Sequence, residues 1–331
     1  MLILYCQELI LQIMIITSMF KKPLSKLFFY IAFMLGAFNA TGQVTEKNYK
    51  IYSVQQGKEV SMQTIIDEME HYDVLFIGEE HNDSVTHYIE HKTLEMLFAA
   101  YNEQVVLSME MFDRDVQGVM DEYLFDGIRE KNFIKDARAW SNYRDYKPMV
   151  EFAKKNHLDV ICANAPSRYT NLVGRLGQEA LMALSDESKR NFAPLPYDTA
   201  SGKYYDKLMG LTSHDASATK DTSKKAPVMS PMGNFNLIMA QSLWDATMAY
   251  SIAEYLKRFK DVKILQVNGR FHSDEGFAIV EQLKNFNPNI RSLIISTSSD
   301  ESFPNINWQE YKEQGDYIII TDPAVPRTYK D

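Results

Sequence analysis

The sequence contains little cysteine, which excludes several classes of protein. Its 331 residues include two cysteines, Cys6 and Cys162. Two cysteines so far apart provide neither the framework of a disulfide-rich domain nor a CxxC metal site. Cys162 lies in an apolar run, where a free cysteine is usually a small buried hydrophobic residue. The fold must therefore depend on an ordinary hydrophobic core, for which a hydrophobic content of 45% is ample.

Positive charge is also scarce. The chain has 35 Lys and Arg against 44 Asp and Glu, which gives a formal net charge of −9 and a pI near 5.4. Binding to nucleic acid through phosphates needs a basic stripe, and the sequence shows none. We therefore expect no nucleic-acid partner. The sequence also lacks an internal repeat of the kind that builds a solenoid.

A hydrophobic run long enough to span a bilayer is missing near the amino terminus. The run Leu27–Phe38 is shorter than the roughly 20 residues that a membrane helix needs. Three lysines precede it, and Ala40 and Gly42 follow it, as in a secretory signal. We interpret residues 1–42 as a targeting segment, with translation starting at Met19, and an uncleaved anchor is the alternative. From this signal-like pattern we expect an exported, periplasmic or envelope-associated protein. No lipid-attachment cysteine follows the apolar run.

Residues 43–331 alternate short apolar runs with longer helical patterns. This alternation predicts a single α/β domain with a largely parallel sheet flanked by helices. The predicted strands are Val74–Ile77, Val105–Met109, Leu158–Ala163, Val262–Val267, Ser292–Ser296 and Tyr317–Ile320. Helices are expected over 82–102 and 236–259, near 113–124 and 146–156, with Pro148 in the first turn of that last helix, and over 275–286.

The region from about 192 to 234 interrupts this alternation. It is rich in proline, tyrosine, serine and lysine, and we interpret it as a helical and loop insertion into the α/β domain. A lid over a binding site and a solvated loop without function are both compatible with this composition.

Ionisable residues follow several of the predicted strands. Glu79 and His81 follow the first, Glu110 follows the second, and His272 follows the fourth. Because the carboxyl ends of parallel strands meet at one edge of the sheet, these four residues should converge. Together they could ligate a divalent transition metal, with a glutamate as general base on bound water. Without a metal, they could act as general acids and bases.

Further polar residues at the same edge suit a cofactor. Arg114, Arg168 and Arg270 could hold an anionic group, and Asn164 and Tyr169 follow the third strand. A flat apolar cofactor such as haem is a second use of such an edge, with Tyr or His on the iron and arginines on the propionates. These five residues are the predicted cofactor-binding set.

The long helix over 236–259 has one unusual face. Gln241 and Asp245 lie one turn apart, next to Trp244. They could form a solvated face, or Trp244 could be buried beside an Asp245 carboxylate that points into the predicted site.

The sequence resembles the ChaN family of haem-binding proteins, within the superfamily of Tiki, TraB and the erythromycin esterases. The resemblance extends from about Tyr72 to about Ile295. The segments that carry it are "LFIGEEHND" (75–83), "LSMEMFDRD" (107–115), "CANAPSRY" (162–169), "AQSLWDATMAYSIA" (240–253) and "VNGRFHSDEG" (267–276).

This resemblance implies an α/β fold with a helical subdomain and a role in haem or iron uptake at the cell envelope. It also implies that Glu79, His81, Glu110 and His272 form the site. Related branches hydrolyse peptides with a metal or cleave esters, so a metal-dependent hydrolase with a divalent ion is the alternative function. The expected partners are haem or another small ligand, outer-membrane uptake components and a second copy of the chain.

Overall fold

The computed structural model describes residues 44–215 and 236–329. The predicted targeting segment and the second half of the insertion lie outside these ranges. Among the residues that the structure describes, none of the helices has both the length and the apolar character that crossing a membrane requires.

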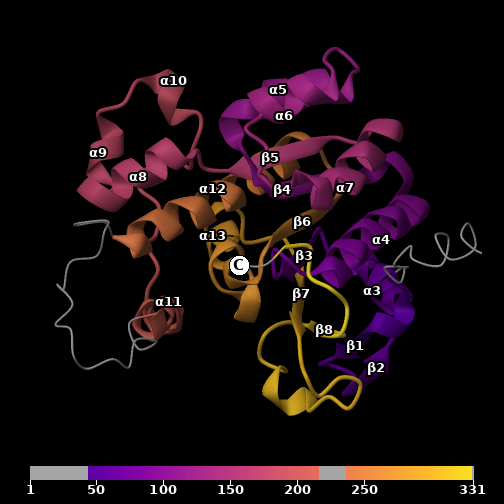
Figure 1. Ribbon diagram of the computed structural model, residues 1–331. Coiled ribbons are helices and arrows are strands. Elements are labelled where there is room, and N and C mark those ends of the chain that lie inside the picture. Colours follow the sequence, from indigo (N-terminus) through magenta and orange to yellow (C-terminus); the bar gives the residue numbers. More distant parts are fainter. Residues whose placement is uncertain (1–43, 216–235, 330–331) are drawn as a thin grey trace, which may run out of the picture. The chain divides into compact units, whose positions relative to one another are not determined.

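The described chain forms one eight-stranded sheet with the order β2-β1-β8-β7-β3-β6-β4-β5 (Figure 1). The six strands from β8 to β5 in this order are parallel, and β1 and β2 are antiparallel additions at one edge. The mostly parallel α/β fold is therefore confirmed. The strands are β1 (Tyr49–Ser53), β2 (Lys58–Val60), β3 (Val74–Glu79), β4 (Val105–Asp113), β5 (Val160–Asn164), β6 (Lys263–Gly269), β7 (Ser292–Ser299) and β8 (Tyr317–Thr321).

All six predicted strands are present as β3 to β8. The two that the sequence analysis missed, β1 and β2, are short and lie at the edge of the sheet. In β1, buried and half-buried residues alternate, and β2 is largely exposed. Neither strand contains the continuous apolar run that marks a strand covered on both faces.

Helices follow most of the strands. They are α3 (Met62–Glu68), α4 (Ser84–Tyr101), α5 (Gln117–Leu124), α6 (Glu130–Asp136), α7 (Tyr143–Lys155), α8 (Ser167–Leu176), α9 (Glu179–Met182), α10 (Asp186–Lys189), α11 (Gly202–Asp215), α12 (Leu237–Arg258) and α13 (Ile279–Phe286). The predicted helices correspond to α4, α5, α7, α12 and α13. Because α7 begins at Tyr143, Pro148 falls in its second turn rather than its first.

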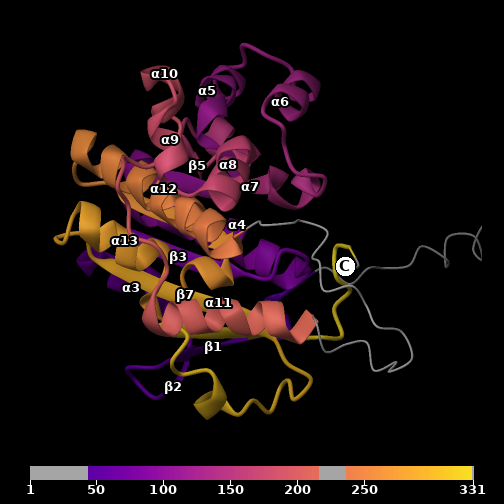
Figure 2. The ribbon, with the colours of Figure 1, turned by 90° about the vertical axis from the view of Figure 1, so that its left-hand side faces the viewer.

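The sheet is covered on both faces, and strand β3 shows how. Successive strand residues point to opposite faces, so Leu75 and Ile77 pack in a core with α3, α4 and α7. Val74 and Phe76 pack in a second core with α12 and α13. Figure 1 shows these two sets of helices on opposite sides of the strands, and in Figure 2 α12 and α13 face the viewer.

The strand order brings the predicted site together. Strand β6 lies between β3 and β4, although β3 ends at Glu79, β4 ends at Asp113 and β6 begins only at Lys263. Glu79 at the end of β3 is in register with Gly269 at the end of β6. The carboxyl ends of β3, β6 and β4 are therefore neighbours at one edge.

The first half of the insertion is docked onto the domain. Tyr204 and Leu208 of α11 form a small buried cluster with Ile238 of α12 and Ala278 before α13. A lid function for the insertion stays a prediction.

Candidate functional site

Three adjacent strand ends bring together the four predicted site residues, which we call the quartet: Glu79, His81, Glu110 and His272. Glu79 is the last residue of β3, with His81 two residues beyond it, and Glu110 lies within β4. His272 ends the short 3-10 helix Arg270–His272 that follows β6. The side chains of Glu79, Glu110 and His272 are almost fully buried, whereas that of His81 is 37% exposed. His81 is therefore the member of the quartet that solvent or a ligand meets.

His272 lies between two buried carboxylates. Its Nδ1 is 2.5 Å from Asp245 Oδ1 and its Nε2 is 3.4 Å from Glu110 Oε1. Burial alone would lower the pKa of His272, but the charges of Glu110 and Asp245 raise it to about 10. Burial would raise the pKa of Glu110, but the charge of His272 and the backbone N–H of Gly269, 2.7 Å from Glu110 Oε2, hold it at about 2. Both groups are therefore ionised at neutral pH.

The side chain of Asp245 on the long helix α12 is buried and does not form a solvated face. It is 1% exposed, and its second oxygen accepts a hydrogen bond from the Tyr204 hydroxyl at 2.7 Å. The side-chain amide nitrogen of Gln241, one turn earlier, lies 3.1 Å from His272 Nδ1. The carboxylate thus points into the site, and both oxygens are occupied by neighbours.

Glu79 forms a second network, with Tyr146, His81 and His87. Its Oε1 accepts hydrogen bonds from the Tyr146 hydroxyl and from His81 Nδ1, both at 2.7 Å. Its Oε2 faces His87 Nδ1 at 3.3 Å. Burial raises the pKa of Glu79, but its contacts with His81 and His87 outweigh this effect and lower it. Burial lowers the pKa of His81, but the Glu79 hydrogen bond and the Glu110 charge reverse the shift and raise it.

The two networks meet where His81 packs against the backbone of β6. A Cβ atom at Gly269 would lie 2.9 Å from His81 Nε2 and 3.7 Å from Glu110 Oε2. A Cβ atom at Gly78 would lie 2.8 Å from the Cα atom of Arg270. Only glycine at 269 leaves room for His81 and Glu110, and only glycine at 78 leaves room for the backbone of Arg270. This explains the glycine in each of the two G-x-x-H segments.

The structure distributes the predicted cofactor-binding residues differently. Arg270 pairs with Asp274 at 3.0 Å, next to the quartet. Asn164 is buried at the end of β5, where its Oδ1 accepts from the N–H of Ala165. Arg168 and Tyr169 lie on α8. Arg114 points away from the quartet, toward Ser251 and Glu254 of α12.

Tyr169 is held by its neighbour in the sequence. The Arg168 guanidinium carbon lies 4.4 Å from the centre of the Tyr169 ring, and its Nη2 donates to the hydroxyl at 3.2 Å. Burial raises the pKa of Tyr169, but hydrogen bonds with Ser188, Arg168 and Asn191 outweigh it and lower the pKa. Burial raises the pKa of many other tyrosines in the described chain, including Tyr143 and Tyr146. The surroundings of Tyr169 thus shift its pKa in the opposite direction from those of Tyr143 and Tyr146.

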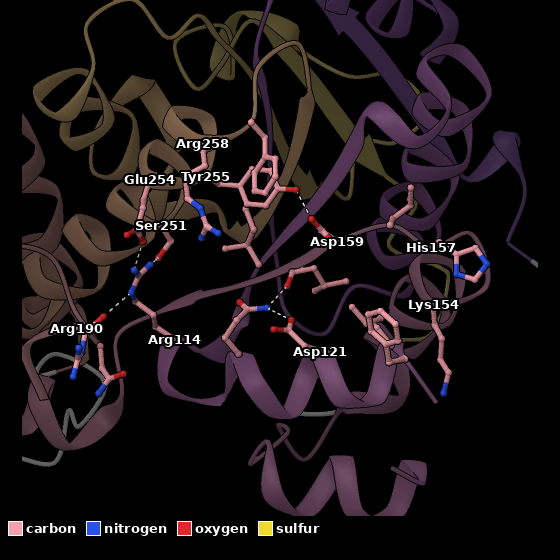
Figure 3. Close-up of a pocket in the computed structure, with 18 of the residues that line it drawn as sticks. Arg114, Asp121, Lys154, His157, Asp159, Arg190, Ser251, Glu254, Tyr255 and Arg258 are labelled. Atoms are coloured by element: carbon pink, nitrogen blue, oxygen red, sulfur yellow. Dashed lines mark hydrogen bonds and ion pairs between the residues drawn. The ribbon is translucent and has the colours of Figure 1, made fainter. Parts of the chain in front are cut away.

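A cavity of about 820 Å³ lies beside the edge strand β5 (Figure 3). Arg114 and Arg190 lie at one end and Lys154 and His157 at the other. Asn191, a partner of Tyr169, also lines it. The side-chain amide of Gln117 occupies the free edge of β5, donating to Val160 O and accepting from Cys162 N, both at 2.8 Å. The edge strand is thus protected from pairing with another strand.

Two residues of these networks, His87 and Glu90, escaped the sequence analysis. His87 and Glu90 are three residues apart on α4, so they share one face of that helix. That face is buried, which a histidine and a glutamate among apolar residues could have signalled. Tyr146 reaches Glu79 only through the packing of α7.

Comparison with known proteins agrees with this architecture. Residues 65–283 match the model of a family described as "Haem-binding uptake, Tiki superfamily, ChaN". The chain belongs to this family. Comparison with curated proteins finds no match.

A solved ChaN structure has the same fold as this ChaN-family chain. A structure of ChaN of Campylobacter jejuni, described as showing cofacial haem binding, superposes with a TM-score of 0.61 at 15% identity, over 83% of this chain and 98% of that one. The type III effector HopBA1 is more distant, with a TM-score of 0.43 at 11% identity, over 79% and 93% of the two chains. A protein from Bacillus cereus gives 0.40 at 12% identity, over 72% and 70%.

Proposed function

We propose that this ChaN-family chain is an exported protein that binds haem and serves haem or iron uptake at the cell envelope. Membership of the family supports haem as the ligand. The basic residues and apolar run before residue 43 support export. No observation among the described residues favours the metal-dependent hydrolase, because both ring nitrogens of His272 already face carboxylates.

The proposed haem site consists of Arg168 and Tyr169 on α8. A phenolate is a known protein ligand of haem iron, and an arginine can neutralise a propionate. Tyr169 has a lowered pKa, and the side chain of Arg168 is 50% exposed. Haem would bind beside α8, with the Tyr169 oxygen on the iron after Arg168 turns toward a propionate.

The neighbouring cavity supports this location. Its volume of about 820 Å³ lies in the range of small-molecule sites. Arg114 and Arg190 lie at one end of the cavity, and Asn191, which follows Arg190 in the chain and hydrogen-bonds with Tyr169, also lines it. Phe125 and Phe259, which are 90% and 42% exposed, line the cavity and provide apolar surface for a flat ring.

Titration of the purified chain with haemin should give a saturable Soret shift at micromolar concentration. Tyr169→Phe should weaken binding by about tenfold or more, which corresponds to at least about 1.4 kcal/mol, and should remove the visible bands of a phenolate ligand. Tyr205→Phe, at an exposed tyrosine of α11, is the control and should bind as the unaltered chain does. Haemin that binds with the same spectrum to Tyr169→Phe would exclude this ligand, and absence of a Soret shift would exclude haem binding.

Export makes a separate prediction. Cell fractionation should find the protein outside the cytoplasm, and the mass of the purified chain should correspond to a start near residue 43. A cytoplasmic protein whose mass still includes Leu27–Phe38 would contradict the signal-peptide interpretation.

A further inference from the structure

A cluster of buried ligand-type side chains lies behind Glu79, away from the exposed imidazole of His81. Glu79, His87 and Glu90 each present one potential ligand atom, and these atoms all lie within 4.8 Å of one another. Their side chains are 0%, 6% and 0% exposed. Carboxylate oxygen and imidazole nitrogen are the donors that zinc, manganese and iron accept in proteins.

The distances match a coordination shell. His87 Nδ1 lies 3.3 Å from Glu79 Oε2 and 3.1 Å from Glu90 Oε2. Metal–ligand bonds of about 2.0–2.2 Å place neighbouring donor atoms roughly 3.0–3.5 Å apart. The three side chains therefore need little movement to share one ion.

Two oxygen atoms in this cluster lack a hydrogen-bond partner. Glu79 Oε2 and Glu90 Oε1 are buried, and within the part of the chain that the structure describes neither accepts a hydrogen bond of normal geometry, although His87 Nδ1 lies 3.3 Å from Glu79 Oε2. A buried carboxylate oxygen without a partner is costly, and native structures rarely leave one unexplained. A bound cation would satisfy both carboxylates at once.

The second nitrogen of His87 has the contact expected of a metal ligand. Its Nε2 lies 3.2 Å from the backbone oxygen of His81 and can donate to it. Metal-binding histidines usually donate their other N–H to a carbonyl or carboxylate, which fixes the ring and leaves the first nitrogen for the metal. The Tyr146 hydroxyl supports Glu79 in the same way, through its Oε1.

We propose that Glu79, His87 and Glu90 bind one divalent first-row transition metal ion in the interior of the domain. Two carboxylates and a neutral imidazole around a divalent ion have no net charge, which suits a buried site. The site is distinct from the proposed haem site at Tyr169 and does not depend on it. It shares Glu79 with the quartet, so the ion would also hold the carboxylate that orients His81.

Glu90→Gln is the sharpest test of this site. Glu90 is fully buried, and its Oε2 lies 3.1 Å from His87 Nδ1. Glutamine has nearly the same size and shape as glutamate and brings no charge into this buried position, so the variant should fold normally. It replaces an anionic ligand with a neutral amide and should weaken metal binding by more than about 100-fold, since loss of a supporting contact alone costs about 10- to 100-fold.

The experiment uses the purified full chain. Elemental analysis and calorimetric titration with Zn²⁺ and Mn²⁺ after chelator treatment should find one ion per chain, and the ion should raise the melting temperature. The control is His91→Gln, one turn beyond His87 on α4, where the half-exposed His91 lies 4.0 Å from Glu95. This variant should bind like the unaltered chain. A chain that binds neither ion, or a folded Glu90→Gln variant that binds as tightly as the unaltered chain, would overturn the proposal.

Discussion

Glu110→Gln should lower the free energy of unfolding by about 3–5 kcal/mol. The substitution removes the charge that faces His272 Nε2 and leaves a buried imidazolium with Asp245 as its remaining carboxylate partner. Breaking a buried ion pair by removing one partner is costly, because the other charge stays in a medium that solvates it poorly. The N–H of Gly269, which donates to Glu110, should also lose its charged acceptor.

Urea unfolding followed by circular dichroism measures this loss. The matched control is Glu254→Gln, which removes the carboxylate partner of Arg114, where the Glu254 side chain is 39% exposed. A pair with that much exposure is screened by water and should contribute less than about 1 kcal/mol. If the two variants lose similar stability, the Glu110–His272 pair is not the strong buried contact that its geometry indicates.

The stabilising effect of His272 should disappear as the pH rises. Its pKa is raised from 6.5 to about 10 in the folded chain. A group whose pKa is raised by folding stabilises the fold fully below its unfolded pKa, and the stabilisation is lost as the pH rises toward the folded value. The difference in unfolding free energy between the unaltered chain and His272→Gln should therefore be constant below about pH 6.5. Above it, the difference should shrink by about 1.4 kcal/mol per pH unit.

Urea unfolding of both proteins between pH 5 and pH 9 gives this difference directly. Groups that do not interact with His272, such as His87 with its pKa of about 9, affect both proteins alike and cancel in the subtraction. His71→Gln, at an exposed position, is the control and should show a small offset at every pH. A difference for His272→Gln that stays flat up to pH 9 would mean that His272 is not held as an imidazolium between Glu110 and Asp245.

These two results bear on what the quartet does. A histidine that is charged and held between two carboxylates is not a free base at neutral pH. His272 is therefore better understood as the group that holds Glu110 and Asp245 in place, and His81 as the group exposed to a ligand. The proposed metal site includes Glu79 of the quartet, whereas the proposed haem site at Arg168 and Tyr169 shares no residue with it.

The strand pattern could be recognised from the sequence because strands β3 to β8 are covered by helices on both faces. Such strands are continuous apolar runs, and the polar residues after them fall at one edge of a parallel sheet. Glu79, His81, Glu110 and His272 were found in this way. Strands β1 and β2 were missed because an edge strand buries too little to show the pattern.

By itself, the sequence determined the α/β class, the ends of the central strands and the four ionisable residues that meet there, because these follow from local hydrophobic patterns and one rule of sheet geometry. Tertiary structure alone decided the partners of those residues. The spacing of His87 and Glu90 places them on one face of α4, but only the packing of α4 against β3 turns that face toward Glu79. The docking of α12 likewise brings Asp245 to His272, and the position of α8 separates Tyr169 from the quartet. Such contacts join distant parts of the chain, and their geometry depends on how whole helices pack against the sheet.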